Sequence, residues 1–136
     1  MTPLGVTLDS TFLIDLMDED RGAVTKANEL HEGRHPLFIG TPVLYEVTTG
    51  ILFGGSRQEA EAFARLASRF TVLPFDEPSA RKAAEMQSDM LRVGRPKQHT
   101  DVMVAAIAAA GGHSLVTRDR DFEDIARIVG LSLESY

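Results

Sequence analysis

Short apolar runs recur along the chain, and most are followed by a longer stretch with helical spacing. The runs favour buried strands, because they are rich in β-branched or aromatic residues and are bounded by Gly, Pro or polar residues. The expected strands cover residues 4–8, 36–40, 70–75, 114–117 and 131–133.

The stretches between these runs predict helices. One helix opens at Thr41-Pro42, with Pro at a favoured first-turn position, and ends at Gly54-Gly55. Residues 102–110 are almost entirely apolar, which predicts a central helix. The helices are expected at about residues 11–17, 21–32, 41–53, 56–68, 78–93, 100–110 and 122–128. In the fourth of these, the apolar residues at helical spacing are Ala60, Phe63, Ala64 and Ala67.

Strands that alternate with helices predict a mostly parallel sheet with helices on both faces. No repeat, low-complexity tract or linker-like run divides the sequence. We therefore expect one α/β domain over residues 1–136.

The composition is that of an ordinary globular protein, with 43% hydrophobic and 25% charged residues. The lack of cysteine excludes disulfides, thiolate zinc sites, iron–sulfur clusters and cysteine nucleophiles. No stretch approaches the ~18 uninterrupted apolar residues of a membrane span, and the start of the sequence lacks the pattern of a signal peptide. A cytoplasmic location without membrane contact is the expectation.

The formal net charge is −6, from 20 acidic and 14 basic residues. This balance argues against a protein that holds nucleic acid through bulk positive charge. A local basic stretch remains, because the only charged side chains between residues 90 and 100 are Arg92, Arg95 and Lys97.

Acidic residues stand near the ends of apolar elements, where a parallel sheet places its ligand crevice. Asp9 directly follows the first apolar run, and Asp101 opens the most apolar helix. Asp119 and Asp121 follow the fourth run. Glu46 lies in a helix among apolar neighbours, where an unpaired carboxylate is costly. Four dispersed segments are thus candidates to bring carboxylates to one point.

Each acid also has an ordinary structural interpretation. Asp9 and Asp121 suit helix caps, and Asp101 suits the first turn of a helix. Asp119 suits a turn, and Glu46 suits an exposed helical position. The residues alone leave both interpretations open for every acid.

Carboxylates that converge need a counter-charge. Within a few ångströms they repel one another, so that some stay protonated or a divalent cation neutralises them. Oxygen ligands without thiolate suit Mg²⁺ or Mn²⁺, and such a cation supports phosphodiester hydrolysis. The histidines offer no convincing general base, because none shares a helical face with a second one.

Four motifs together resemble the PIN domain family and, within it, the VapC-type toxin ribonucleases of type II toxin–antitoxin systems. The motifs are LDSTFLID (8–15), PVLYEV (42–47), DVMVAAIA (101–108) and LVTRDRDF (115–122), and the resemblance covers essentially the whole chain. It implies a PIN-like three-layer α/β/α sandwich with a central, mostly parallel sheet. It also implies an endoribonuclease that depends on Mg²⁺ or Mn²⁺.

The resemblance assigns roles residue by residue. Asp9, Glu46, Asp101 and Asp119 match the family's four catalytic and metal-binding acids, with Asp9 and Asp101 as the most direct metal ligands. Asp121 matches an acid that many members carry before Phe, which makes it a further candidate ligand. The residues implied to support these acids are Ser10, Thr11 and Thr117, where Thr11 replaces an Asn found in many members.

The resemblance further implies a homodimer and a VapB-like antitoxin whose basic segment occupies the acidic cleft, a pairing that is electrostatically sensible. RNA is the expected substrate, with transfer RNA as one candidate. The bases expected to contact RNA phosphates are Arg92, Arg95, Lys97, Arg118 and Arg120, although each also suits a solvated surface.

Two other functions compete with a ribonuclease. One is a non-catalytic PIN-like binding module, against which the intact set of acids argues. The other is a Mg²⁺-dependent aspartyl phosphoacceptor domain. The sequence disfavours it, because haloacid-dehalogenase-like phosphatases need a second Asp two residues after the nucleophile, where this chain has Thr11.

Overall fold

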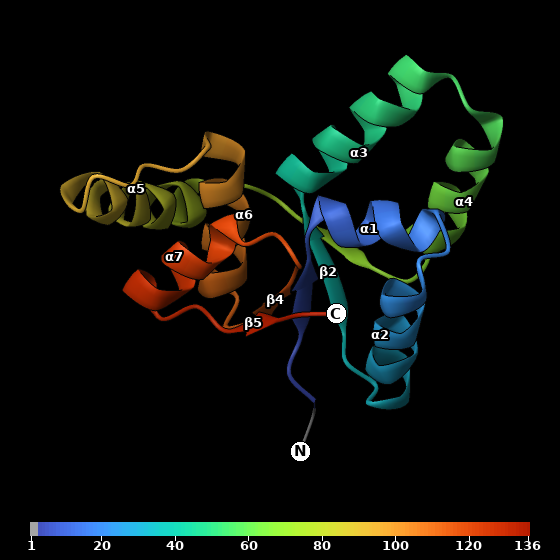
Figure 1. Cartoon of the computed structure of the whole chain (residues 1–136), viewed down its shortest axis with the longest axis horizontal. Helices are drawn as coiled ribbons and strands as arrows, with labels where there is room; N and C mark the ends of the chain where they lie inside the picture. Colours follow the sequence, from blue (N-terminus) through green and yellow to red (C-terminus); the bar gives the residue numbers. More distant parts are fainter. Residues whose placement is uncertain (1–2) are drawn as a thin grey trace.

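The computed structural model describes residues 3–136. Over this range, strands and helices alternate along the chain (Figure 1). The strands are β1 (Val6–Leu8), β2 (Leu37–Gly40), β3 (Thr71–Leu73), β4 (Ser114–Val116) and β5 (Leu133–Glu134). The helices are α1 (Ser10–Met17), α2 (Arg21–Glu32), α3 (Thr41–Gly54), α4 (Arg57–Ala67), α5 (Glu77–Arg92), α6 (His99–Ala110) and α7 (Asp121–Val129).

The strands form one sheet in the order β3-β2-β1-β4-β5, and all pairings among residues 3–136 are parallel. Thr7 of the central strand β1 pairs with Phe38 of β2 on one side and with Leu115 of β4 on the other. From β1, the chain first forms β2 and β3 on one side of that strand. It then forms β4 and β5 on the other side. The carboxyl ends of β1 and β4 therefore flank the point where the strand order reverses, the usual ligand site of open parallel sheets.

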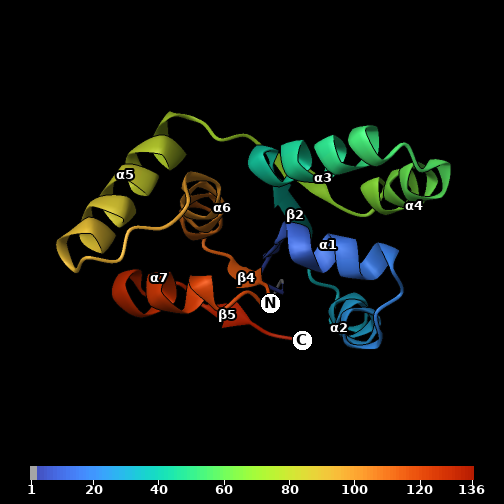
Figure 2. The same ribbon diagram turned by 45° about the horizontal axis from the view of Figure 1, so that its top comes forward.

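Helices cover both sides of the sheet. In Figures 1 and 2, α5, α6 and α7 gather on one side, and α1, α2 and α4 gather on the other. Helix α3 contacts both α1 and α6. These layers confirm the predicted α/β architecture with a parallel central sheet.

Helix α6 is the central helix that its apolar sequence predicts. Its residues Val104 to Ala108 are each at most 2% exposed, so that every face of the helix is buried over this stretch. It packs against α3, α5, α7 and the strands β1 and β4. No helix in residues 3–136 is both long and apolar enough to cross a membrane, α6 included.

Two buried aromatic residues anchor the helices that follow β1 and β4. Phe12 of α1 is 1% exposed and Phe122 of α7 is 0% exposed. Full burial of such a side chain stabilises the fold by about 3 kcal/mol at most. The starts of both helices, which lie beside the acidic residues, are therefore held by the core.

The first strand is shorter than the sequence predicts. It begins at Val6, whereas residues 4–8 were expected, and Leu4 is 73% exposed. Backbone–backbone hydrogen bonding to the neighbouring segment starts at the Val6 amide, which donates to the Pro36 carbonyl at 2.9 Å, whereas the Leu4 carbonyl meets the His35 ring, at 2.8 Å. Without a backbone partner among the described residues before that point, the apolar Leu4 does not become part of the sheet.

The predicted apolar face of α4 is wrong. Ala60, Ala64 and Ala67 are exposed, and no α4 side chain in the described chain is fully buried. The helix contacts the other helices mainly through α1, at the rim of the molecule. Phe63 is its main apolar anchor, with its ring centroid 6.0 Å from that of Phe70.

Candidate active site

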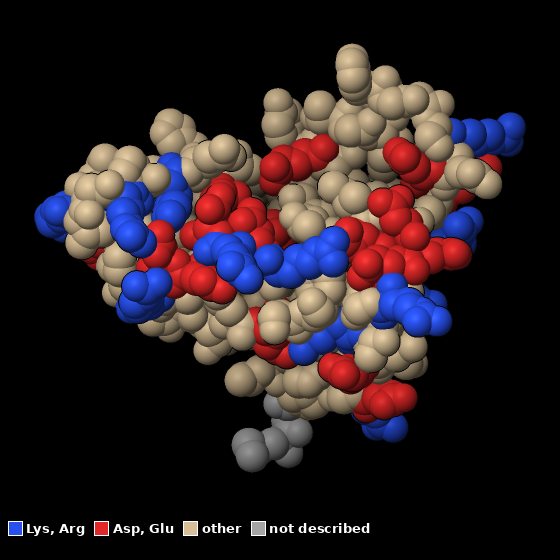
Figure 3. All heavy atoms as spheres, viewed as in Figure 1, with Lys and Arg blue, Asp and Glu red and all other residues tan. Residues whose placement is uncertain are grey.

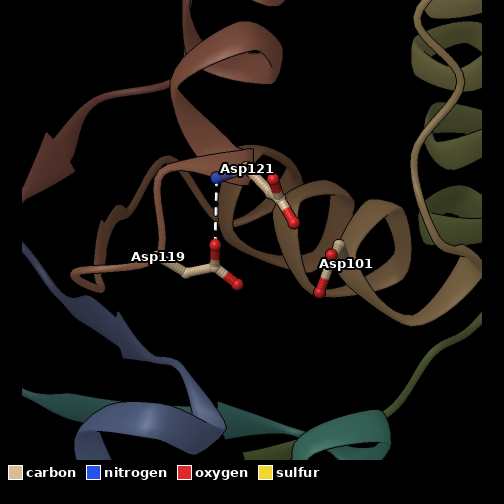
Figure 4. A group of neighbouring side chains, drawn as sticks. All are labelled: Asp101, Asp119 and Asp121. Carbon is tan, nitrogen blue, oxygen red and sulfur yellow. Dashed lines mark hydrogen bonds between the residues drawn. The ribbon is translucent and has the colours of Figure 1, made fainter.

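Three carboxylates from two separate parts of the chain face one another at one end of the sheet. Asp101 lies in the first turn of α6, Asp119 lies between β4 and α7, and Asp121 is the first residue of α7. One oxygen of each lies within 4.8 Å of the others (Figure 4). This spacing is close enough for one cation to contact all three.

Asp9 adjoins this cluster at the end of β1. It caps the N-terminus of α1, where its Oδ1 accepts a hydrogen bond from the Ser10 amide at 2.8 Å. Its Oδ2 accepts a hydrogen bond from the Thr117 hydroxyl at 2.9 Å. The same hydroxyl accepts a hydrogen bond from the Asp119 amide at 3.0 Å. Thr117 therefore connects Asp9 to the segment that carries Asp119.

Glu46 reaches the site from α3, but its surroundings differ from those expected. Its side chain is exposed and borders a groove with Ile14 and Met17, whereas the sequence suggested an apolar environment. Partial desolvation of the carboxyl group and the charge of Asp9 still raise its pKa, while the Ser10 hydroxyl opposes this. Glu46 is thus an exposed acid at the edge of the cluster.

The electrostatics of Asp101 show that the acids converge. Burial raises its pKa to about 6, and the negative charges of other acids contribute to the same shift. These acids are, in decreasing order of effect, Asp119, Asp9, Glu46 and Asp121. Every acid that the sequence proposed for the site thus acts on Asp101.

Asp9 also has a raised pKa. Burial is the largest cause, and the charge of Asp119 adds to it, whereas hydrogen bonds from Thr117, Ser10 and Thr11 lower it. The side chain is only 4% exposed. The hydroxyl residues proposed to support the acids therefore include two, Thr117 and Thr11, that act on the Asp9 carboxylate.

Capping and site formation are combined in some of these acids. Asp9 is both the cap of α1 and a neighbour of the cluster. Asp119 accepts a hydrogen bond from the Asp121 amide at 2.9 Å, at the start of α7 (Figure 4). The interpretation of Asp121 as the cap is wrong, because Arg120 occupies that position and Asp121 directs its carboxylate into the cluster.

The chemistry of the donor set fits a divalent cation. The ligands available are carboxylate oxygens, which suit Mg²⁺ or Mn²⁺. Burial and then mutual repulsion among them raise the pKa of Asp101, and a bound cation would relieve the repulsion. Their roles as ligands stay a prediction that the geometry allows.

Most of the proposed RNA-binding bases are already engaged by acids. Arg92 bonds to Asp89 at 2.8 Å on the same helix. Arg95 and Lys97 bond to Asp124 at 2.9 and 2.8 Å, and the Lys97 side chain is only 14% exposed. The contacts of Arg95 and Lys97 hold the segment before α6 against α7, so that these two bases have a structural role.

The other two bases lie beside the acidic cluster in sequence. Arg118 bonds to Asp15 at 3.1 Å and lies 3.9 Å from Asp20. Arg120 is exposed and forms no salt bridge among the described residues. Figure 3 shows acidic side chains in the middle of this face, between the two groups of helices, with basic side chains next to them.

Sequence reasoning gave no role to Asp15 or Tyr136. The Tyr136 hydroxyl donates a hydrogen bond to Asp15 at 2.5 Å, and Asp15 also holds Arg118. Asp15 stands in the first family motif, but its partners Arg118 and Tyr136 stand near the other end of the sequence. No local pattern links positions at that separation.

Comparison with known proteins gives one family and a consistent set of structures. The PIN domain model matches residues 6–128. Ribonuclease VapC5 of Mycobacterium tuberculosis is 29% identical over 126 residues, which cover 89% of this chain and 87% of that protein.

Two solved complexes illustrate the structural similarity. VapBC2 from Rickettsia felis, bound to a DNA fragment from its promoter, matches with a TM-score of 0.83 at 20% identity. DNA-bound VapBC from Salmonella typhimurium matches with a TM-score of 0.76 at 25% identity. Each match covers 97% of this chain and 98% of the other chain.

Proposed function

The chain belongs to the PIN domain family, and from this premise we propose that it is a divalent-metal-dependent endoribonuclease that acts as the toxin of a toxin–antitoxin pair. The proposal places this activity in one PIN domain over residues 1–136. Its substrate is RNA, with transfer RNA as the first class to test.

One observation carries the proposal. Five carboxylates from four segments lie close enough for the charges of four to act on the fifth, Asp101, beside the carboxyl ends of β1 and β4. Acids gathered at such a point destabilise the fold unless protons or a counter-ion neutralise them. A site that holds a cation and acts on phosphodiesters accounts for their presence.

The residues of the proposed site have different roles. Asp101, Asp119 and Asp121 would hold Mg²⁺ or Mn²⁺, with Asp9 and Glu46 completing the negative site. When bound, such a cation polarises phosphate oxygens and lowers the pKa of water. Thr117 and the Ser10 amide fix both oxygens of Asp9, and the first turn of α6 fixes Asp101.

The named relatives support the toxin assignment. One relative is called a ribonuclease, and the matched complexes are VapBC pairs. We therefore include a VapB-like antitoxin and a homodimer in the proposal. A basic antitoxin segment would suit the acidic site electrostatically.

The geometry weakens the phosphoacceptor alternative. Both oxygens of Asp9 accept hydrogen bonds, and its side chain is 4% exposed. A carboxylate held in this way is poorly placed to attack a phosphoryl group from solution. The non-catalytic binding module remains as the alternative that an activity assay decides.

The test is RNA cleavage by the purified protein. A pool rich in transfer RNA is incubated with Mg²⁺, Mn²⁺ or EDTA, beside the variant Asp101→Asn. Asp89→Asn is the matched control, because Asp89 is a partly exposed acid on α5 that pairs with Arg92. We expect discrete cuts by the wild type and the control that vanish in EDTA and in Asp101→Asn. Equal cleavage by folded Asp101→Asn would contradict the proposed site.

A further inference from the structure

A second set of contacts joins the segments that carry the acidic site. Asp15 of α1 accepts a hydrogen bond from the Tyr136 hydroxyl at 2.5 Å. The same Oδ2 atom of Asp15 lies 3.1 Å from a guanidinium nitrogen of Arg118. We refer to Asp15, Arg118 and Tyr136 as the anchor network.

The aromatic ring of Tyr136 completes the packing of this network. The Arg118 guanidinium carbon lies 5.4 Å from the ring centroid, within the range of a cation–π contact. The buried ring of Phe12 meets the Tyr136 ring edge-on, with centroids 4.9 Å apart. Tyr136 therefore contacts α1 at two points and Arg118 at a third.

The charged groups of the anchor network meet where the Asp15 carboxylate is largely shielded from solvent. The Asp15 side chain is only 13% exposed, whereas the Arg118 side chain is 48% exposed. Desolvation and the bond to Asp15 raise the pKa of Tyr136, so that its hydroxyl keeps the proton it donates. A sheltered, charge-assisted contact of this kind is stronger than an exposed ion pair.

The place of Arg118 in the sequence connects the network to the acids. Arg118 stands between Thr117, which bonds to Asp9, and Asp119, which belongs to the carboxylate cluster. Asp15 stands on α1, the helix that Asp9 caps. The segment after β4 and helix α1 are thus joined twice, once by Thr117 and Asp9 at the site and once by Arg118 and Asp15 beside it.

We propose that Asp15, Arg118 and Tyr136 are positioning residues that hold the Asp119 segment against α1 at the spacing that a divalent cation requires. This inference rests on the proposed function, because it concerns the same acidic site. Residues that orient metal ligands from outside commonly change metal affinity by about 10- to 100-fold when they are replaced.

Two substitutions separate positioning from charge. Tyr136→Phe removes one hydroxyl and leaves the charge unchanged. Arg118→Met removes a positive charge beside an anionic site, which by electrostatics alone would strengthen cation binding. Weaker binding in both variants therefore requires a change in the arrangement of the acids.

The experiment measures the Kd of the metal alone, Mn²⁺, by titration calorimetry well below the unfolding temperature of each variant. Tyr45→Phe is the matched control, because Tyr45 is 70% exposed on α3. We expect Tyr136→Phe and Arg118→Met to raise the Kd by about fivefold or more, Arg118→Lys to restore part of the affinity, and Tyr45→Phe to match the wild type.

Other outcomes would overturn the inference. If Tyr136→Phe and Arg118→Met lower the melting temperature but leave the Kd unchanged, the network only stabilises the fold. Absence of Mn²⁺ binding in the wild type would also refute it. A wild type that binds Mn²⁺ but cleaves no RNA would count against the proposed function alone, since the Kd comparison does not depend on cleavage.

Discussion

The Thr117 hydroxyl donates a hydrogen bond to the Asp9 carboxylate at 2.9 Å and joins the ends of two neighbouring strands, β1 and β4. Thr117 is 3% exposed and Asp9 is 4% exposed, so that water does not replace this bond easily. The pair fixes one acid at the point where the strand order of the sheet reverses. The arrangement of the remaining acids depends on it, because Thr117 also accepts a hydrogen bond from the Asp119 amide.

Replacing Thr117 with Val should destabilise the protein by about 1–3 kcal/mol, because a buried Asp9 oxygen then lacks its donor. No buried side-chain oxygen or nitrogen in residues 3–136 lacks a partner in the wild type, so this loss creates a new defect. Urea unfolding measures the change. Thr117→Ser keeps the hydroxyl and should stay within about 1 kcal/mol of the wild type. Equal destabilisation by Ser and Val would show that the methyl group, not the hydrogen bond, matters.

Replacing Asp101 with Asn should stabilise the metal-free protein near neutral pH. The pKa of Asp101 is about 6 in the folded state, above its ordinary value of 3.8, because of burial and neighbouring charges. A raised pKa gives stability that is present below about pH 4 and is lost as the pH rises through about 6. Asn avoids this loss, and we expect a gain of about 1–2 kcal/mol at about pH 8 that disappears near pH 4.

The check is urea unfolding of both proteins in EDTA across that pH range. Asp89→Asn, which replaces a partly exposed acid on α5 outside the acidic cluster, serves as the control. A constant difference between wild type and Asp101→Asn at all pH values would indicate that ionisation of Asp101 is not the cause.

The order of strands and helices could be predicted because each depends on local pattern. The apolar runs locate β1 and β4, and the acids that follow them, Asp9 and Asp119, share one end of a parallel sheet by topology. Predictions from local pattern are wrong where tertiary contacts determine which face of a helix is buried. The pattern predicts an apolar face on α4 that has little to pack against, because α4 lies at the rim.

Ion pairs between residues far apart in the sequence are the second structural feature that could not be predicted from the sequence. Lys97 and Asp124 are 27 residues apart, yet they form a sheltered ion pair that occupies a base proposed for RNA. Arg118 and Tyr136 meet at Asp15 in the same way, from distant parts of the sequence. Such pairs depend on how helices dock, and composition or spacing does not encode their partners individually.

Mn²⁺ should stabilise the wild type and leave Asp101→Asn nearly unchanged. At a hundredfold excess over the Kd, binding to the folded state adds about 2.7 kcal/mol. The effect should weaken below about pH 6, because protons compete for Asp101, whose pKa is about 6. Thermal unfolding with Mn²⁺ or EDTA at several pH values measures both effects. No thermal shift at millimolar Mn²⁺ would favour the non-catalytic binding module.

His113 should make the fold sensitive to acid. Its ring stacks on Phe38 with centroids 4.5 Å apart, and its Nδ1 lies 3.0 Å from the hydroxyl of the buried Thr7. Burial lowers the pKa of His113 below its ordinary value of 6.5. A lowered His pKa gives stability that is present above about pH 6.5 and is lost as the pH falls below it.

Because Asp101 acts in the opposite direction over part of this range, the measurement uses the Asp101→Asn background. In that background Asp9 and Glu46, whose pKa values are also raised, still act in the opposite direction. We therefore expect a difference between two proteins: from about pH 7 to pH 5, His113→Gln should lose less urea stability than its parent. His99→Gln is the control, since His99 is exposed at the start of α6. An identical pH dependence with and without His113 would assign the acid sensitivity to another group.

Lys97 and Arg120 should separate stability from RNA binding. Lys97→Met removes the most sheltered of the three cations on Asp124 and leaves Arg95 and Arg127, so it should lower the melting temperature while the RNA affinity of the folded protein stays unchanged. Arg120→Met should leave stability within about 0.5 kcal/mol, because Arg120 is exposed. It should weaken RNA binding and reduce the salt dependence of that binding, as expected for one lost phosphate contact.

The measurement is the binding of a labelled RNA at two salt concentrations. Each substitution is made in the Asp101→Asn protein. If Lys97→Met weakens RNA binding as strongly as Arg120→Met, Lys97 contacts RNA despite its ion pair, and the structural role assigned to Lys97 is incomplete.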